Sequence, residues 1–441
     1  MDTDDRERTM KRRIFAVDLL RGIVMMIMLL DHTRDFVYAG ALQSDPTDPS
    51  TTTVAVFFTR WITHFCAPVF VFLSGVSIYL QRLSGKSNAE LARFLWTRGL
   101  WLIFLEFTLI RFLVIFNFDY SLFGMPQVIW VIGVSMIVMA ALIYAPVRAV
   151  GIAGVTMIFL HNLLDPIQVP PQIAFAGTPP PNLWQSLWIT LHQQGLIPLP
   201  GGSQMFVLYP LIPWIGVMMA GYALGVVYSW ESERRRKLLL QLGLVATVLF
   251  VVVRFANVYG DPVPWRSVIT PPIPRAAAVD NIPLVTDGAA TPVAAEKPEP
   301  RGNGYVLLSF LNTTKYPVSL LFLLMTLGPA LIVLALADGI DGQAIWQRIC
   351  ITFGRVPLFF YILQWIVAHG GAVLLSWLAG KDASYLFLSP LEMSQSAPPE
   401  YGFSLSVVYA IWIAGLILVY PLCAWFAALK KRNRHWVLSY L

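Results

Sequence analysis

The sequence predicts an all-α membrane protein, a polytopic helix bundle of about ten transmembrane helices with both termini in the cytoplasm. Of its 441 residues, 57% are hydrophobic and only 13% are charged, which excludes an ordinary water-soluble globule. The apolar segments are long enough to cross the roughly 30 Å hydrocarbon core of a bilayer. They lie at residues 14–33, 57–80, 94–116, 128–146, 149–165, 205–229, 237–255, 316–337, 356–379 and 404–428.

The orientation follows from the basic residues between these segments. Lysines and arginines gather at residues 6–13, 82–98, 234–237, 348–355 and 430–434, and the predicted spans put all of these on one side. By the positive-inside rule that side is cytoplasmic. The net charge of +6 needs no nucleic acid, because topology and contact with the lipid bilayer explain it.

A single transmembrane domain is expected over residues 14–429, between an N-terminal tail at 1–13 and a C-terminal tail at 430–441. Two outside connections, 166–204 and 256–304, are long and rich in proline, and we expect part of the second to be poorly ordered. The three cysteines show no disulfide framework, and the six scattered histidines have no metal-ligand spacing. We therefore expect no metal site.

The first segment carries ionisable residues where a membrane span is normally apolar. At about 100° per residue, Asp18, Arg21 and His32 fall within about 60° of one another and share one stripe. Asp18 and Arg21 can pair near the cytoplasmic face. His32 lies roughly 21 Å further along the axis, near the outer face. Such groups are costly in lipid and indicate a functional path.

The second and third segments add further polar positions inside the membrane. His64 and Pro68 open the second segment. Arg98 lies at the cytoplasmic edge of the third, and Glu106 lies deep within it. A buried carboxyl group there must be protonated or paired, and the candidate partners for Glu106 are Arg21 and Arg111.

Later segments carry fewer such groups. Lys315 and Tyr316 lie at the outer mouth of the eighth segment, and Gln364 lies inside the ninth. His161 and His369 are expected to be helix residues with satisfied hydrogen bonds. No internal repeat is visible.

An ordered set of motifs resembles a known superfamily. The run VDLLRG at 17–22, with His32 following, comes first, and then come CAPVFVFLSGVS, RGLWLIFLEFTLIRF, YPLIPWIGVMMAGYALG, TKYPVSLLFLLMTLG and GRVPLFFYIL. The set is similar to the transmembrane acyltransferase superfamily, closest to bacterial proteins of the heparan-alpha-glucosaminide N-acetyltransferase kind (the DUF1624 group) and related to acyltransferase-3. The resemblance implies an enzyme of the bacterial inner membrane that transfers an acyl group, in the first instance acetyl, from cytoplasmic acyl-CoA to an extracytoplasmic glycan or small-molecule hydroxyl or amine.

The resemblance also implies roles for single residues. His32 matches a position held to be catalytic, as base or nucleophile, and Arg98 resembles an arginine that helps to hold CoA. His64 stands where one branch of the family has an aspartate, and Gln364 stands where related members have a histidine. His64 therefore joins His32 as a catalytic candidate.

Each of these residues also has a plainer interpretation. His32 can be a helix-end residue bonded to loop backbone, and Arg98 a positive-inside anchor. The Asp18 and Arg21 pair either positions the first helix or touches CoA. Glu106 is either a structural partner or a proton relay. Helix geometry makes Asp35 a better partner for His32 than its neighbour Asp31, which points about 100° away.

Two other functions stay open at this stage. Intramembrane charges also suit a small-molecule transporter or flippase, and the departure at Gln364 suits a non-catalytic protein on the same fold. The oligomeric state also stays open, with a homodimer among the alternatives.

Overall fold

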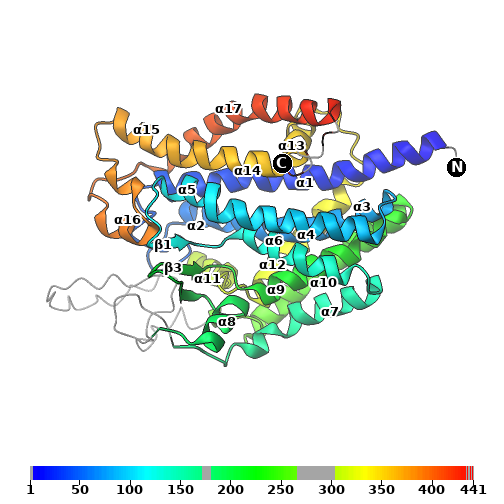
Figure 1. Ribbon diagram of the computed structural model, residues 1–441, viewed down its shortest axis with the longest axis horizontal. Helices are drawn as coiled ribbons and strands as arrows, with labels where there is room; N and C mark the ends of the chain where they lie inside the picture. The colour runs from blue at the N-terminus through cyan, green and yellow to red at the C-terminus, as the bar shows by residue number, and fades with distance from the viewer. Residues whose placement is uncertain are drawn as a thin grey trace.

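The computed structural model describes residues 3–170, 180–265 and 303–433, together with residues 435, 438 and 440. Its long helices run side by side along one axis (Figure 1). The start of α1 (Thr3–Val37) and the end of α17 (Leu405–Arg432) lie at the same end of the bundle, here called the terminal end. Most of the predicted loop 256–304 lies outside the described residues, and so do residues 171–179 of the other long loop. The expectation of poor order in part of the 256–304 loop therefore concerns residues outside the described ranges.

The long helical segments between α1 and α17 occupy the other predicted spans. They are α2 (Val54–Trp61), η1 (Ile62–Phe65) and α3 (Cys66–Leu83); α4 (Asn88–Leu105), the π-helical turn η2 (Glu106–Ile110) and α5 (Arg111–Ile115); α6 (Val128–Leu142); α7 (Val147–Leu160) and η3 (His161–Leu164); α9 (Leu211–Leu224) and η4 (Gly225–Ser229); α10 (Ser232–Ala256); α12 (Leu320–Ala337); and α14 (Pro357–Trp365), the π-helical turn η6 (Ile366–Gly370) and α15 (Gly371–Leu378).

Shorter helices and strands connect these long helical segments. They are β1 (Leu122–Gly124), α8 (Leu183–Leu191), β2 (Gly195–Pro198), β3 (Gln204–Val207), α11 (Asn303–Leu311), α13 (Ile345–Arg355), η7 (Ser384–Phe387) and α16 (Pro390–Ser396). Apart from α13, they lie at the end of the bundle opposite the terminal end, here called the outer end (Figure 1).

The predicted all-α membrane bundle is confirmed. Seven helical segments among the described residues are long and apolar enough to cross a bilayer, namely those that begin at Val54, Val147, Leu211, Ser232, Leu320, Pro357 and Leu405. The other three predicted spans are helical too: α1 and the α4–α5 segment carry several charged residues, and α6 has 15 residues. The protein is thus a multi-pass membrane protein.

The predicted start of the second span was wrong. The helix begins at Val54, and His64 lies ten residues further on, in the 3₁₀ turn η1. Pro68 has no N–H to donate to the carbonyl of residue 64, so the regular α-helical bonding is interrupted there. His64 therefore lies in a break within the span, and it does not open a helix.

The small sheet at the outer end was not predicted. Its strand order is β1-β3-β2, with β2 antiparallel and β1 parallel to β3. Strands of three or four residues are too short for a period-two pattern to stand out in a sequence this apolar.

The helix α1 is the centre of the bundle. It packs against α3, α12, α13, α14 and α17. Its crossing with α13 is so close that a Cβ added to Gly354 would lie 1.9 Å from the Asp18 carbonyl oxygen. Glycine is therefore required at this crossing, which fixes the polar residues of α1 relative to α13.

Candidate functional site

A cavity of about 300 Å³, here called the His32 cavity, is lined largely by residues from the outer end of the bundle. Residues from α1, η1, α3, α14 and several outer connections line it. Its polar lining residues are Asp31, His32, Asp35, Arg60, Thr63, Gln127, Tyr209, Lys315, Tyr316 and Tyr361, and its apolar lining includes Met28, Phe70 and Trp365.

His32 lies against one wall of this cavity. Its imidazole ring packs on the Trp365 indole, with ring centroids 3.8 Å apart, and its side chain is 14% exposed. Its Nδ1 has no hydrogen-bond partner. Among the described residues His32 does not bond to loop backbone, so the plainer interpretation of this histidine is not supported.

A network of charged side chains surrounds His32. Asp31 accepts hydrogen bonds from Arg60 Nη1 at 2.7 and 2.6 Å and lies 3.1 Å from Arg34 Nη2, which also bonds to Asp35. Asp35 Oδ2 lies 3.9 Å from His32 Nδ1, too far for a direct hydrogen bond. As helix geometry predicts, Asp35 faces His32, whereas Asp31 is committed to the two arginines.

Lys315 and two tyrosines bring hydroxyl and ammonium groups to the cavity. The Lys315 ammonium lies 5.0 Å from the centroid of the Tyr316 ring, and the hydroxyls of Tyr209 and Tyr316 are 3.4 Å apart. These groups can bind a carbonyl oxygen or an acceptor hydroxyl. The sequence placed Lys315 and Tyr316 at the outer mouth of the eighth span, whereas it gave Tyr209 no role of its own.

Arg60 is a site residue that the sequence reasoning missed. It lies near the start of the second predicted span, and a charge inside a span is itself a signal of a paired or functional group. Asp31 and Asp35 are the acidic residues at a similar depth in the first span, so a search for a basic partner could have identified Arg60.

His64 is not part of the cavity lining. It is 3% exposed, its ring packs on Phe322 at 5.2 Å, and its Nδ1 has no partner. The structure therefore places His32 and His64 in different surroundings.

The expectation that Glu106 pairs with Arg111 or Arg21 was wrong. The Glu106 carboxylate accepts hydrogen bonds at 3.2 Å from the backbone N–H groups of Gln127 and Trp130, at the start of α6. A helix N-terminus leaves such donors without partners and favours a negative charge. Arg111 donates instead to backbone carbonyls of residues 117 and 119.

Gln364 also lies outside the cavity lining, although its neighbours Tyr361 and Trp365 contribute to it. Its side chain is fully buried, and neither its amide oxygen nor its amide nitrogen has a partner. His161 and His369 have both ring nitrogens within hydrogen-bonding distance of backbone carbonyls, as predicted.

The other polar residues of α1 belong to a basic cluster towards the terminal end. Arg21 donates to Asp18 at 3.3 Å, to Ser77 Oγ at 2.8 Å and to the Gly354 carbonyl at 3.2 Å. Arg355 lies 3.7 Å from Asp18. Lys430 lies within electrostatic range of Asp18 and Arg21, and Arg98 lies within range of Arg21 and Lys430, so the cluster contains four cations and one carboxylate.

The predicted pairing of Asp18 with Arg21 is thus present, and the cluster suits a phosphate-bearing ligand by its charge. The His32 cavity does not extend to Asp18, Arg21 or Arg98. In α1 the two sites are separated by Val24, Met25 and Leu29, which are all buried.

The described residues include no group of three His, Cys, Asp or Glu side chains that could hold a metal ion. What α1 presents is therefore an imidazole in an outer cavity and a basic cluster towards the opposite face.

Comparison with known protein families gives one informative match. Residues 13–256, more than half of the chain, match the family model described as heparan-alpha-glucosaminide N-acetyltransferase, catalytic. The matched part includes His32, His64 and Arg98, whereas Lys315 and Gln364 lie beyond it. No curated protein sequence matches the chain.

Proposed function

The chain belongs to the heparan-alpha-glucosaminide N-acetyltransferase family, and on this basis we propose that it transfers an acetyl group from cytoplasmic acetyl-CoA to an extracytoplasmic acceptor. The acceptor group is a hydroxyl or amine of a sugar-like molecule. The observation that carries the proposal is the placement of the His32 imidazole in the outer cavity, with the Asp35 carboxylate facing its Nδ1, which leaves Nε2 as the nitrogen that can act on an acceptor.

The donor side of the proposal rests on the basic cluster. The phosphate groups of acetyl-CoA need several cationic donors, and Arg21, Arg98, Arg355 and Lys430 supply them in one region. The excess of Lys and Arg at this end supports a cytoplasmic location for the cluster. The membrane that we propose for the protein is the bacterial inner membrane.

His32 would act on the acceptor as a general base. It removes the proton from the attacking hydroxyl or amine, whose oxygen or nitrogen then bonds to the thioester carbonyl carbon. The carbon–sulfur bond breaks, and the leaving thiolate takes up the proton. In the two-step alternative His32 first accepts the acetyl group itself and then passes it to the acceptor.

Asp35 would position His32 during this step. A small movement closes the 3.9 Å gap between its carboxylate and Nδ1, and a carboxylate there stabilises the imidazolium that forms. Lys315, Tyr209 and Tyr316 would supply hydrogen bonds to the carbonyl oxygen as negative charge develops on it.

The test is His32→Ala in the purified full-length protein, reconstituted in vesicles with acetyl-CoA and D-glucosamine. We expect CoA release and acetylation to fall at least about 100-fold, because a general base typically contributes that much or more. His64→Asn is the matched histidine control and is expected to keep measurable activity, since His64 does not line the cavity.

Thermal unfolding of each variant checks that the fold is retained. A folded His32→Ala protein with the wild-type rate would refute the role of His32. Net solute movement without thioester cleavage would refute the enzyme and favour a transporter.

A further inference from the structure

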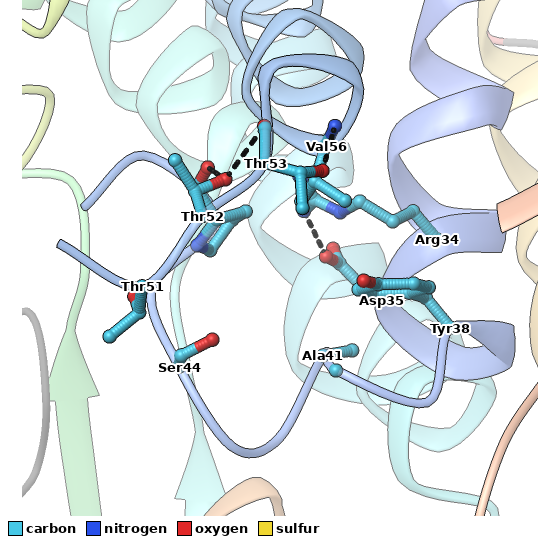
Figure 2. A pocket seen from close by; sticks show the side chains of 11 residues that line it. Arg34, Asp35, Tyr38, Ala41, Ser44, Thr51, Thr52, Thr53 and Val56 are labelled. Atoms are coloured by element: carbon cyan, nitrogen blue, oxygen red, sulfur yellow. Dashed lines mark hydrogen bonds and ion pairs between the residues drawn. The ribbon is translucent and has the colours of Figure 1, made fainter. Parts of the chain in front are cut away.

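Figure 2 shows the lining of a second, smaller cavity, which shares residues with the His32 cavity. It has a volume of about 70 Å³ and lies between the last turn of α1 and the loop that leads to α2. Asp35 and Ala41 line both cavities, so the two are neighbours. We call the smaller one the Arg34 cavity, and its lining is Arg34, Asp35, Tyr38, Gly40, Ala41, Ser44, Pro46, Thr51, Thr52, Thr53 and Val56.

Arg34 is the unusual member of this lining. Arg34 is only 3% exposed, and its Nη2 forms ion pairs with Asp31 and Asp35. Its Nη1, however, is buried without a hydrogen-bond partner. Leaving a buried charged donor unpaired is costly, so an oxygen atom next to this nitrogen would stabilise the site.

The serine and threonine hydroxyls of the lining fall into two classes. Thr52 Oγ1 donates to the Pro46 carbonyl, and Thr53 Oγ1 accepts the Val56 N–H, so these two hold the loop and the start of α2. The hydroxyls of Ser44 and Thr51 make no hydrogen bond within the described residues and lie on the loop side of the cavity (Figure 2). They remain available to a ligand, both as donors and as acceptors.

The charge of the lining indicates a neutral ligand. Arg34 and Asp35 carry opposite charges and neutralise each other. An anion would be repelled by the Asp35 carboxylate, and a cation by the Arg34 guanidinium. A pair of alcohol hydroxyls suits both charged side chains, because one hydroxyl oxygen accepts a hydrogen bond from Arg34 while the other hydroxyl donates one to Asp35.

The size of the cavity limits what it can hold. On this scale one water needs about 10 to 15 Å³, so the cavity has room for several water-sized groups but not for a large ligand. It therefore suits the hydroxyl-bearing edge of a sugar whose remaining part extends into the His32 cavity.

We propose that the Arg34 cavity is a subsite for the hydroxyl groups of the acceptor that do not react. The inference rests on the proposed function and adds the location and the recognising residues. Asp35 contacts Arg34 on one side and faces His32 on the other, so a sugar held there presents its neighbouring amine or hydroxyl to His32.

The experiment compares two acceptors of the same ring size. D-Glucosamine carries hydroxyls beside its amine, whereas cyclohexylamine carries none. Ser44→Leu places an apolar side chain in the Arg34 cavity, and Gln43→Leu makes the same kind of change at the exposed neighbour that does not line it. The full-length protein in vesicles, with acetyl-CoA as donor, is assayed for kcat/KM with each amine.

We expect Ser44→Leu to lower the ratio of kcat/KM for glucosamine to that for cyclohexylamine about tenfold, the effect of losing one or two hydrogen bonds. Gln43→Leu is expected to leave the ratio unchanged. If the wild type accepts glucosamine alone, the same two variants are compared by KM for glucosamine, and only Ser44→Leu should raise it.

Failure of the subsite and failure of the enzyme give different results. Acetylation by the wild type with an unchanged ratio in folded Ser44→Leu, or an equal fall in both variants, overturns the subsite and leaves the acetyltransferase intact. Absence of transfer to either amine by the wild type overturns the proposed function and the subsite with it. Thr51→Val, which removes one hydroxyl and little volume, repeats the test if Ser44→Leu does not fold.

Discussion

At the residue scale, the role of an ionisable side chain in this protein depends on which backbone or side-chain groups lie opposite it. Glu106 illustrates this, since its two carboxylate oxygens bind the first N–H groups of α6. The sequence shows that a carboxylate lies deep in a span, but the position of another helix's N-terminus relative to it is a matter of tertiary packing. Partners within one helix, such as Asp18 with Arg21, follow from spacing alone.

Removing the Glu106 carboxylate should destabilise the protein and leave the chemistry intact. Glu106→Ala leaves two buried N–H groups unpaired, which costs about 1–3 kcal/mol in the free energy of unfolding. Glu106→Gln retains one acceptor oxygen and should lose less. Thermal unfolding in detergent measures both effects.

A loss of activity without a loss of stability would contradict this role of Glu106. If Glu106→Gln unfolds at the wild-type temperature but loses acetyl transfer, the residue is a proton relay after all. Wild-type kcat with a lowered unfolding temperature fits the capping role.

The site residues divide in the same way between local and distant relations. The polar stripe of α1, with His32 nearest to Asp35, could be predicted because one helix fixes those relative directions. That Arg60, Tyr209 and Tyr316 share one cavity with His32 could not be predicted, because these residues come from separate elements that meet only in the folded protein.

At the element scale, the crossing of α1 and α13 couples packing to the basic cluster. Gly22 and Gly354 allow backbone contact, since a Cβ on Gly22 would lie 1.8 Å from the Cys350 carbonyl oxygen. Arg21 donates to the Gly354 carbonyl at this crossing. The spans themselves were predictable from their apolar length, but α13, which is amphipathic and has 11 residues, was not recognised as a separate helix.

Gly354→Ala should therefore both destabilise the protein and weaken donor binding. Its Cβ would lie 1.9 Å from the Asp18 carbonyl oxygen, so the helices must separate, at about 1–3 kcal/mol. We expect a lower unfolding temperature and a KM for acetyl-CoA raised several-fold, because Arg21 moves with the crossing.

Gly339→Ala is the matched control, since a Cβ at that exposed glycine has no atom within 4 Å. Equal unfolding temperatures for the two variants would show that the α1–α13 contact is not a constraint.

At the scale of the whole molecule, the orientation in the membrane rests on the distribution of charge. The structure brings the start of α1 and the end of α17 to one end of the bundle, which agrees with the even number of predicted spans (Figure 1). The helices alone do not say which end faces the cytoplasm. That assignment comes from the basic residues of the sequence.

Labelling of single introduced cysteines tests the orientation. The three native cysteines are buried, so a membrane-impermeant maleimide reports on introduced, exposed positions. In right-side-out spheroplasts we expect Ser50→Cys at the outer end to react, and Lys86→Cys at the terminal end to react only after lysis. The opposite pattern would invert the proposed directions of donor and acceptor.

The buried side chains of Val24, Met25 and Leu29 have a consequence for the proton gradient across the membrane. They keep apolar material between the His32 cavity and the basic cluster, so α1 can carry ionisable groups near both faces without offering protons a wetted route down their gradient. On the proposed function the acyl arm of the donor must part these side chains to reach His32. The apolar barrier between the two sites would then open only while the acyl arm itself occupies the opening.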